Sequence, residues 1–188
     1  MDQHQLIIVI AVIVAVIVVA AIAFLLARER RSKQLRQRFG PEYGRVLKKE
    51  GEVRRAEGVL QMRAKRHDQF PLRPLSESSR LDFAERWRTV QSHFVDEPKG
   101  SVAQADLLVN EVMVARGYPM VDFEQRAADI SVDHPVVVEN YRAAHAIAQR
   151  HNAGEASTED LRQAMVHYRS LFEELLGDSS TERKEARA

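Results

Sequence analysis

Cysteine is absent from the 188-residue chain. Its absence excludes a disulfide-stapled scaffold and a lipid anchor attached to cysteine, and it is compatible with a reducing compartment. The sequence also lacks a P-loop, a GxSxG element, a HExxH zinc motif and a dinucleotide-binding glycine pattern. No segment shows the two-residue alternation that is typical of strands. We therefore expect an all-α protein that is not an enzyme.

Polar residues are missing from one long stretch near the N-terminus, Leu6 to Ala27, which reads LIIVIAVIVAVIVVAAIAFLLA. Twenty-two helical residues measure about 33 Å, enough to cross a hydrocarbon core of about 30 Å. The stretch contains no ionisable side chain, so we expect an anchor and not a pore. Residues 1–27 are thus predicted to be a transmembrane segment. Alanines four residues apart would also allow two such helices to approach closely and form a homo-oligomer.

The charges flanking this stretch predict its orientation. Residues 1–5 carry Asp2 and no Lys or Arg, whereas basic residues crowd the other side. Because Lys and Arg are retained in the cytoplasm, we expect a single-pass protein of the plasma membrane with its N-terminus outside and its C-terminal domain cytoplasmic. A cleaved signal peptide is the competing interpretation. It is disfavoured because a signal peptide carries its positive charge before a shorter apolar core.

Charge is distributed unevenly along the rest of the chain. Residues 28–66 contain 14 basic and 5 acidic side chains, a net charge of +9, whereas residues 67–188 carry 14 basic and 21 acidic ones, a net charge of −7. Basic residues beside a bilayer attract anionic lipids. The residues expected to make this contact are Arg28, Arg30, Arg31, Lys33, Arg36 and Arg38. The alternative is that they only set the topology. Nucleic acid is an unfavourable partner because the distal domain is acidic and no DNA-reading motif is present.

Breakers and caps divide the remaining sequence. Gly40-Pro41 is expected to interrupt the helix that leaves the membrane, and Glu42 to Gln69 to form one long charged helix, so residues 28–69 make a basic juxtamembrane stalk. Residues 70–75 (FPLRPL) form an extended linker. Helical periodicity then continues through residues 76–176, and residues 177–188 form a polar, disordered tail.

Residues 76–176 are predicted to fold as a small bundle of about five helices. Ser76 is expected to cap the first helix, whose inward residues include Phe83 and Trp87. Pro98 is expected to start the second helix, and Gly117 to end it. The later helices are expected to begin at Asp122, at Pro135 and at the cap Ser157-Thr158-Glu159-Asp160.

Several longer segments resemble an uncharacterised group of bacterial single-span membrane proteins with a cytoplasmic helical domain. These segments are RFGPEY (38–43), RPLS (73–76), FVDEP (94–98), RGYP (116–119), DFEQRAADISVDHP (122–135) and EDLRQAMVHYRSLFEELL (159–176). The resemblance covers nearly the whole chain and implies a bacterial plasma membrane. It implies no substrate, cofactor or catalytic residue.

The histidines do not predict a metal site. His134, His145 and His151 share one region, but His145 and His151 are six residues apart and point away from each other on a helix. We expect His134 to lie at the start of a helix and His145 to be a packed, neutral side chain. No catalytic, cofactor-binding or metal-binding residue is therefore predicted, and no cofactor.

Two functions fit this sequence. The first is a membrane-anchored, non-enzymatic interaction or scaffold module that binds a partner protein of unknown identity. The alternative is a membrane-tethered sensor that binds a small ligand or lipid inside the bundle. A large apolar cavity between the helices would favour the sensor, whereas an exposed apolar patch on a solid bundle would favour the interaction module.

Overall fold

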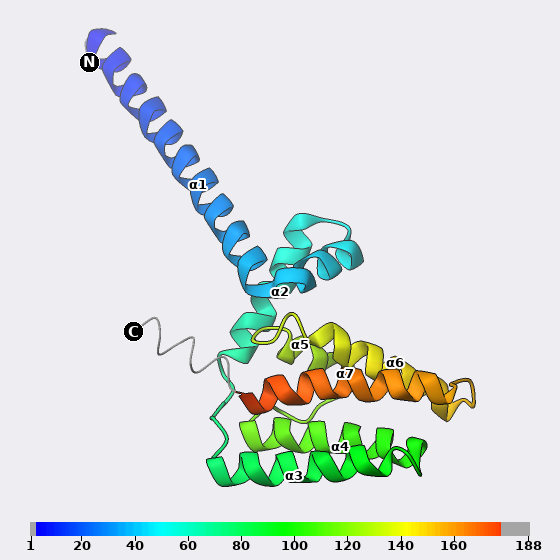
Figure 1. Ribbon diagram of the computed structural model, residues 1–188. Helices are drawn as coiled ribbons and strands as arrows, with labels where there is room; N and C mark the ends of the chain where they lie inside the picture. The colour runs from blue at the N-terminus through cyan, green and yellow to red at the C-terminus, as the bar shows by residue number, and fades with distance from the viewer. Residues whose placement is uncertain (1–2, 178–188) are drawn as a thin grey trace. The chain divides into compact units, whose positions relative to one another are not determined.

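The computed structural model describes residues 3–177, and their side chains from Ile13 onward. This part of the chain forms seven helices and no strand (Figure 1). The all-α prediction is confirmed. The chain divides into two compact units, residues 1–38 and residues 39–188. The predicted disordered tail lies outside the described residues, apart from Gly177, where the last helix ends.

Helix α1 (Gln3–Glu50) contains the predicted interruption. Gly40 has φ 45° and ψ −122°, which is not a helical conformation, and the chain resumes its helical path at Pro41. A side chain at this φ would be strained, so glycine suits the position. Proline suits the next one because the first turn of a helix leaves its N–H groups unpaired. The predicted break at Gly40-Pro41 is therefore confirmed.

Across the described residues, none of the helices combines the length and the apolar character needed to cross a bilayer. The predicted span runs from Leu6 to Ala27, and the side chains of residues 6–12 lie outside the described part.

The predicted long helix from Glu42 to Gln69 is wrong. Helix α1 ends at Glu50, Gly51 adopts a left-handed φ of 73°, and α2 (Val53–His67) begins two residues later. The charged pattern continues through this point, so periodicity gave no sign of the turn. Residues 39–67 form a helical hairpin. Five of its hydrophobic side chains are buried: Phe39, Tyr43, Val46, Ala56 and Leu60.

The predicted helical bundle is confirmed, with five helices from α3 to α7. Residues 71–76 belong to no helix or strand and lead into α3 (Glu77–His93), which is followed by α4 (Pro98–Arg116) and α5 (Phe123–Ile130). Helices α6 (Val138–Asn152) and α7 (Thr158–Gly177) complete the bundle. Helix α4 packs against α3 and α7, and α7 packs against α6, so these four helices lie side by side (Figure 1).

Caps and breakers position most of these helices as predicted. The Ser76 hydroxyl accepts a hydrogen bond from the Ser79 N–H, and Asp122 accepts one from the Gln125 N–H. Gly117 ends α4 with a left-handed φ of 94°. A Cβ there would lie 2.5 Å from the Pro71 carbonyl oxygen, so glycine also lets the linker pass closely. The predicted start of α6 at Pro135 is wrong, because the chain turns through Pro135 and the helix begins at Val138.

The bundle has one continuous apolar core built from α3 to α7. Trp87 is 5% exposed and stacks on Phe172 with a centroid distance of 4.6 Å and an interplanar angle of 18°. The predicted inward position of Phe83 and Trp87 on α3 is therefore confirmed. The buried side chains of the hairpin do not belong to this core. What joins the hairpin to the bundle is a separate and largely charged set of contacts.

Candidate functional site at the hairpin–bundle interface

Glu42 lies at the centre of the contacts between the hairpin and the bundle. Its side chain is 0% exposed, although it is a carboxylate. Arg63 of α2 donates a hydrogen bond to Oε1 at 2.7 Å. Arg142 of α6 donates to both oxygens, from Nη1 to Oε2 at 2.8 Å and from Nη2 to Oε1 at 3.0 Å. The carboxylate therefore joins the two helices of the hairpin to α6, which lies 100 residues later in the sequence.

The local sequence explains why Glu42 reaches this position. Pro41 begins the second half of α1, so Glu42 falls in a first turn, where a negative charge is favoured by the helix dipole. Burying a carboxylate is costly unless it is paired and hydrogen-bonded. Here the two guanidinium groups supply both the opposite charge and the donors. The geometry makes Glu42 an anchoring residue of the interface.

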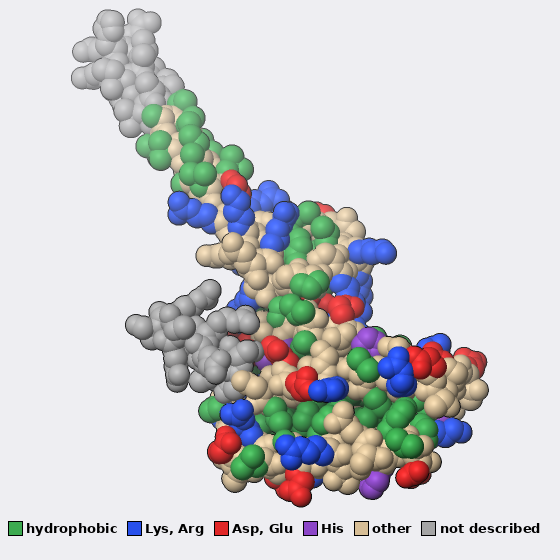
Figure 2. All heavy atoms as spheres, viewed as in Figure 1, with side chains coloured by type: hydrophobic (Ala, Val, Ile, Leu, Met, Phe, Trp, Pro, Cys, Tyr) green, Lys and Arg blue, Asp and Glu red, His purple; other side chains and the backbone are tan. Residues whose placement is uncertain are grey.

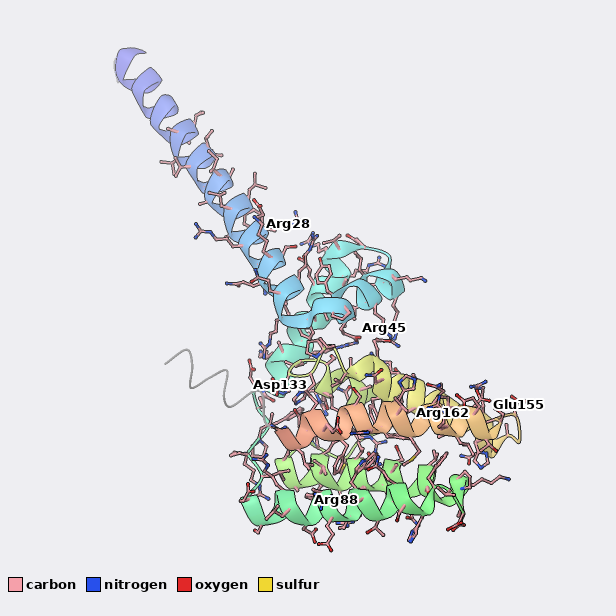
Figure 3. The ribbon with its side chains drawn as sticks, viewed as in Figure 1. Arg28, Arg45, Arg88, Asp133, Glu155 and Arg162 are labelled. Atoms are coloured by element: carbon pink, nitrogen blue, oxygen red, sulfur yellow. The ribbon has the colours of Figure 1, made fainter. Side chains whose placement is uncertain are left out.

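Further charged contacts extend the interface on both sides of Glu42. On one side, Arg45 approaches Glu139 of α6 at 3.5 Å. On the other, Arg66 donates a hydrogen bond to Asp129 of α5 at 3.2 Å. Figure 3 labels Arg45, which faces α6, and shows the side chains between the hairpin and the bundle. Interfaces of this polar kind are typical of contacts between units that can move relative to each other.

A second polar group surrounds the end of α2. His67 is 6% exposed, and its Nε2 lies 2.7 Å from Oδ2 of Asp133, in the turn between α5 and α6 (Figure 3). The Tyr118 hydroxyl donates to the same oxygen at 3.3 Å. The rings of His67 and Phe70 meet edge to face, with centroids 5.5 Å apart. These contacts fix the end of the hairpin and the start of the linker onto the bundle.

The pKa values in this group follow from burial and from the neighbouring charges. Burial opposes the charged form of Asp133, but hydrogen bonds from His67 and Tyr118 and the charges of the two adjacent histidines outweigh it. The pKa of Asp133 is therefore lowered. Burial, reinforced by the charge of Asp133, raises the pKa of the Tyr118 hydroxyl. At neutral pH, Asp133 is thus a carboxylate and Tyr118 remains a hydrogen-bond donor.

His134 follows Asp133 and points toward the C-terminal end of α7. Its Nδ1 lies 3.2 Å from a Glu174 oxygen, while its buried Nε2 has no hydrogen-bond partner among the residues that the structure describes. Burial lowers the pKa of His134, although Glu174 favours the charged form. Nearby, Arg116 donates to the Leu175 carbonyl at 2.9 Å and closes the end of α7. His134 was expected at a helix start, but it lies before the turn that precedes α6.

The arrangement pairs buried polar groups of different helices with one another. His67 and His134 are 6% and 2% exposed, so neither imidazole is open to a ligand from solvent. Asp129 is 1% exposed and receives hydrogen bonds from Arg66 and from the Gln125 side chain at 2.7 Å. A general acid or base must reach its substrate to within hydrogen-bond distance. In this structure these charged groups pair with one another inside the fold.

The bundle also has an open groove between α3 and α4, with a volume of about 300 Å³. Val90 and Leu108 form part of its lining, and Leu107 lies at its edge with 60% of its surface exposed. An ion pair between Arg86 of α3 and Glu111 of α4 crosses the same region. The groove therefore combines an apolar floor with both signs of charge. In the space-filling view, apolar side chains are interspersed with charged ones over the bundle (Figure 2).

The residues predicted for lipid contact lie elsewhere, on α1 before the break at Gly40. All six side chains are exposed and belong to the first compact unit, whereas the polar interface belongs to the second. Glu42, His67 and Asp133 were missed as site residues. The signals available were weak: Glu42 follows a Gly-Pro break, and Asp133 and His134 precede a proline. Neither pattern indicates which residues the chain will bring together.

Among the described side chains, no group of three or more His, Asp or Glu residues is placed to hold a metal ion. His145 instead stacks on Phe123, with ring centroids 3.6 Å apart, and burial lowers its pKa. It is thus packed, as expected from the sequence. No protein-family model, curated protein or solved structure matches the chain.

Proposed function

We propose that this protein is a membrane-anchored, non-enzymatic interaction module. In this proposal residues 6–27 cross a bacterial plasma membrane once, with the N-terminus outside and the helical domain in the cytoplasm. The unbroken apolar stretch supports the anchor, and the basic residues that follow it support the orientation. The helical domain binds a partner protein that is confined to, or recruited to, the same membrane.

The observation that carries the interaction function is the α3–α4 groove beside exposed Leu107. A groove of about 300 Å³ with an apolar floor and flanking charges suits an apolar side chain from a partner, oriented by polar contacts at its rim. In contrast, the polar residues that could have performed chemistry are buried in helix-to-helix pairs around Glu42 and Asp133. This contrast favours binding over catalysis.

A membrane-tethered sensor for a small ligand is the second candidate. The observation that favours it is the same groove, whose volume lies at the lower end of the range for small-molecule sites. A small ligand would need to be held by Arg86 and Glu111, which already pair with each other. We therefore rank the protein partner first.

Photo-cross-linking in cells tests the interaction function. A photoreactive residue replaces Leu107 in the full chain, and a matched control replaces Val95, which is 84% exposed but lies outside the lining of the groove. We expect one defined protein to be cross-linked at position 107 and not at position 95. Deleting residues 1–27 should weaken the capture, because anchoring raises the effective concentration at the membrane. Equal capture at both positions would contradict the proposal.

The orientation is tested separately with reporters fused after the last residue. A reporter that is active only in the cytoplasm should be active, and one that is active only outside the membrane should be silent. The reverse pattern would contradict the topology. A soluble full-length protein that leaves no fraction in the membrane would contradict the anchor itself.

A further inference from the structure

The first unit carries a dense group of basic side chains directly after its apolar stretch. Arg28, Arg30, Arg31, Lys33, Arg36 and Arg38 are all exposed on α1. The apolar side chains before them are also exposed, for example Val19 at 66% and Leu25 at 60%. Figure 2 shows the change from apolar to basic side chains along this helix, and Figure 3 labels Arg28 at the boundary. The boundary is therefore abrupt.

The basic side chains surround the helix and do not form a one-sided stripe. With 3.6 residues per turn, Arg30, Arg31 and Lys33 point about 200°, 300° and 140° around the axis from Arg28. Arg36 points in a further direction at about 80°, and Arg38, at about 280°, lies close to the direction of Arg31. A helix lying on a membrane surface keeps its bases on one face and its apolar residues on the other. A ring of bases suits a helix that leaves the bilayer through the head groups.

Distance along the helix separates the basic residues into two sets. At 1.5 Å per residue, Lys33 lies about 7.5 Å beyond Arg28, and Arg38 lies about 15 Å beyond it. The Debye length at physiological ionic strength is about 8 Å. Only the basic residues from Arg28 to Lys33 therefore lie close enough to interact strongly with the lipid head groups. Lys33 shares its charge with Glu29, 2.7 Å away, a pairing that also lowers the pKa of Glu29.

We propose that Arg28, Arg30 and Arg31 form a basic collar that binds anionic lipid head groups around α1 where it emerges from the bilayer. This inference rests on the proposed membrane anchor and adds a lipid specificity to it. Each arginine near the surface contributes a favourable electrostatic interaction, and its fork of donors can bind phosphate oxygens. The collar would enrich phosphatidylglycerol-type lipids around the protein.

The collar is tested with the purified full chain in lipid nanodiscs. The protein has no cysteine, so Ala27→Cys, at an exposed position directly before Arg28, provides a single site for a fluorophore at the proposed boundary. Nanodiscs of phosphatidylcholine contain a tenth of either brominated phosphatidylglycerol or brominated phosphatidylcholine, and the quenching by the two lipids is compared. We expect stronger quenching by phosphatidylglycerol at low salt and a smaller difference at high salt.

A matched pair of double variants distinguishes lipid binding by the collar residues from attraction by the net charge of the helix. Arg28→Gln with Arg30→Gln should reduce the enrichment of phosphatidylglycerol about fivefold for each charge removed. Arg36→Gln with Arg38→Gln removes the same charge farther along the helix and should change the enrichment less than about twofold.

Each of the other outcomes overturns the inference in a distinguishable way. Equal quenching by both lipids in the unmodified chain would mean that the bases set only the topology. Equal losses in the two double variants would mean that net charge, and not the collar, attracts the lipid. If neither lipid quenches the probe, the segment does not lie at a bilayer, and the proposed anchor fails together with the collar.

Discussion

Arg142 donates hydrogen bonds to both carboxylate oxygens of Glu42, a residue 100 positions earlier in the chain, with donor–acceptor distances of 2.8 and 3.0 Å. This contact links the hairpin to α6 and lies among further charged contacts. A bidentate pair has a defined direction as well as a defined distance, so it orients the hairpin on the bundle. Charge pairing outside the main apolar core therefore holds the hairpin of residues 39–67 to the bundle.

Glu42→Gln should destabilise the full chain strongly, because Arg142 and Arg63 would lose the charge that compensates them. Breaking one partner of a buried ion pair typically costs about 3–5 kcal/mol. Glu52→Gln is the control, since Glu52 is 56% exposed and pairs with Arg55 at 3.4 Å, and exposed pairs contribute about 0–1 kcal/mol. Denaturant unfolding in detergent measures both. Similar losses in the two variants would mean that Glu42 does not anchor the interface.

Fragments test whether the hairpin stabilises the bundle. A fragment of residues 76–176 should fold as a helical domain, because the apolar core lies within α3 to α7. A fragment of residues 39–177 should be more stable, since it retains the partners of Asp129, Asp133 and Arg142. Circular dichroism with thermal melting compares the two. An unfolded shorter fragment would mean that the bundle does not fold alone. Equal melting temperatures of the two fragments would mean that the hairpin does not stabilise the bundle.

Trp87 is the sharpest test of the core. Trp87→Ala should cost about 3–5 kcal/mol, since a large buried aromatic side chain would leave a cavity against Phe172. Trp87→Phe should cost less, because within the described part of the chain the indole Nε1 makes no hydrogen bond that the substitution would remove. Arg88→Ala, at the exposed neighbouring position, is the control. An unchanged melting temperature in Trp87→Ala would mean that the stacking with Phe172 does not stabilise the bundle.

Stability should fall as the pH is lowered from 8 to 5. The pKa of His134 is lowered from 6.5 by burial, so below about pH 6.5 the unfolded chain binds a proton that the folded chain still excludes. His145, whose pKa is lowered for the same reason, contributes with the same sign. The lowered pKa of Asp133 acts only below about pH 3.8, where its contribution is progressively lost.

Unfolding free energies measured across this range test the assignment to His134. His134→Gln should flatten the dependence between pH 8 and 5, whereas His93→Gln, at an exposed position at the end of α3, should leave the dependence unchanged. A slope that is the same in His134→Gln and the unmodified chain would assign the effect to other groups.

The sequence predicted most of the helices because local chemistry determines where they begin and end. Ser76 and Asp122 accept the N-terminal hydrogen bonds expected of caps, and Gly117 has the left-handed conformation expected of a C-terminal glycine. The faces containing Trp87 and Tyr168 follow from the spacing of apolar residues. These features depend on neighbours within one or two turns, and such neighbours are visible in the sequence.

The hairpin and its interface could not be predicted in the same way. Gly51 lies in a charged segment whose helical pattern continues on both sides, so the turn there depends on packing that only the folded chain provides. Glu42 was expected at the start of a long charged helix, yet its side chain is fully buried. Its burial depends on Arg63 and Arg142, which approach from distant positions. Patterns within one segment contain no information on such pairs.

Single polar substitutions distinguish an interaction module from an enzyme. We expect His134→Ala, His145→Ala and Glu139→Ala, each made alone, to retain partner capture by the photoreactive residue at position 107 when capture is normalised to folded protein. The reason is that His134 is buried, His145 stacks on Phe123 and Glu139 pairs with Arg142 at 2.8 Å. None of the three belongs to the lining of the groove. Thermal melting of each variant separates loss of folding from loss of binding.

Substitutions in the α3–α4 groove, in contrast, are expected to lower partner capture. Gln104→Ala and Thr89→Ala, which trim its lining without removing a core side chain, should lower capture several-fold while leaving the melting temperature nearly unchanged. Interfaces depend on a few central side chains surrounded by tolerant ones, so the loss should be graded and not complete. If a folded His134→Ala or Glu139→Ala variant instead lost all activity while the groove variants kept it, function would depend on one titratable group. We would then assign the function to catalysis at the polar interface and not to binding at the groove.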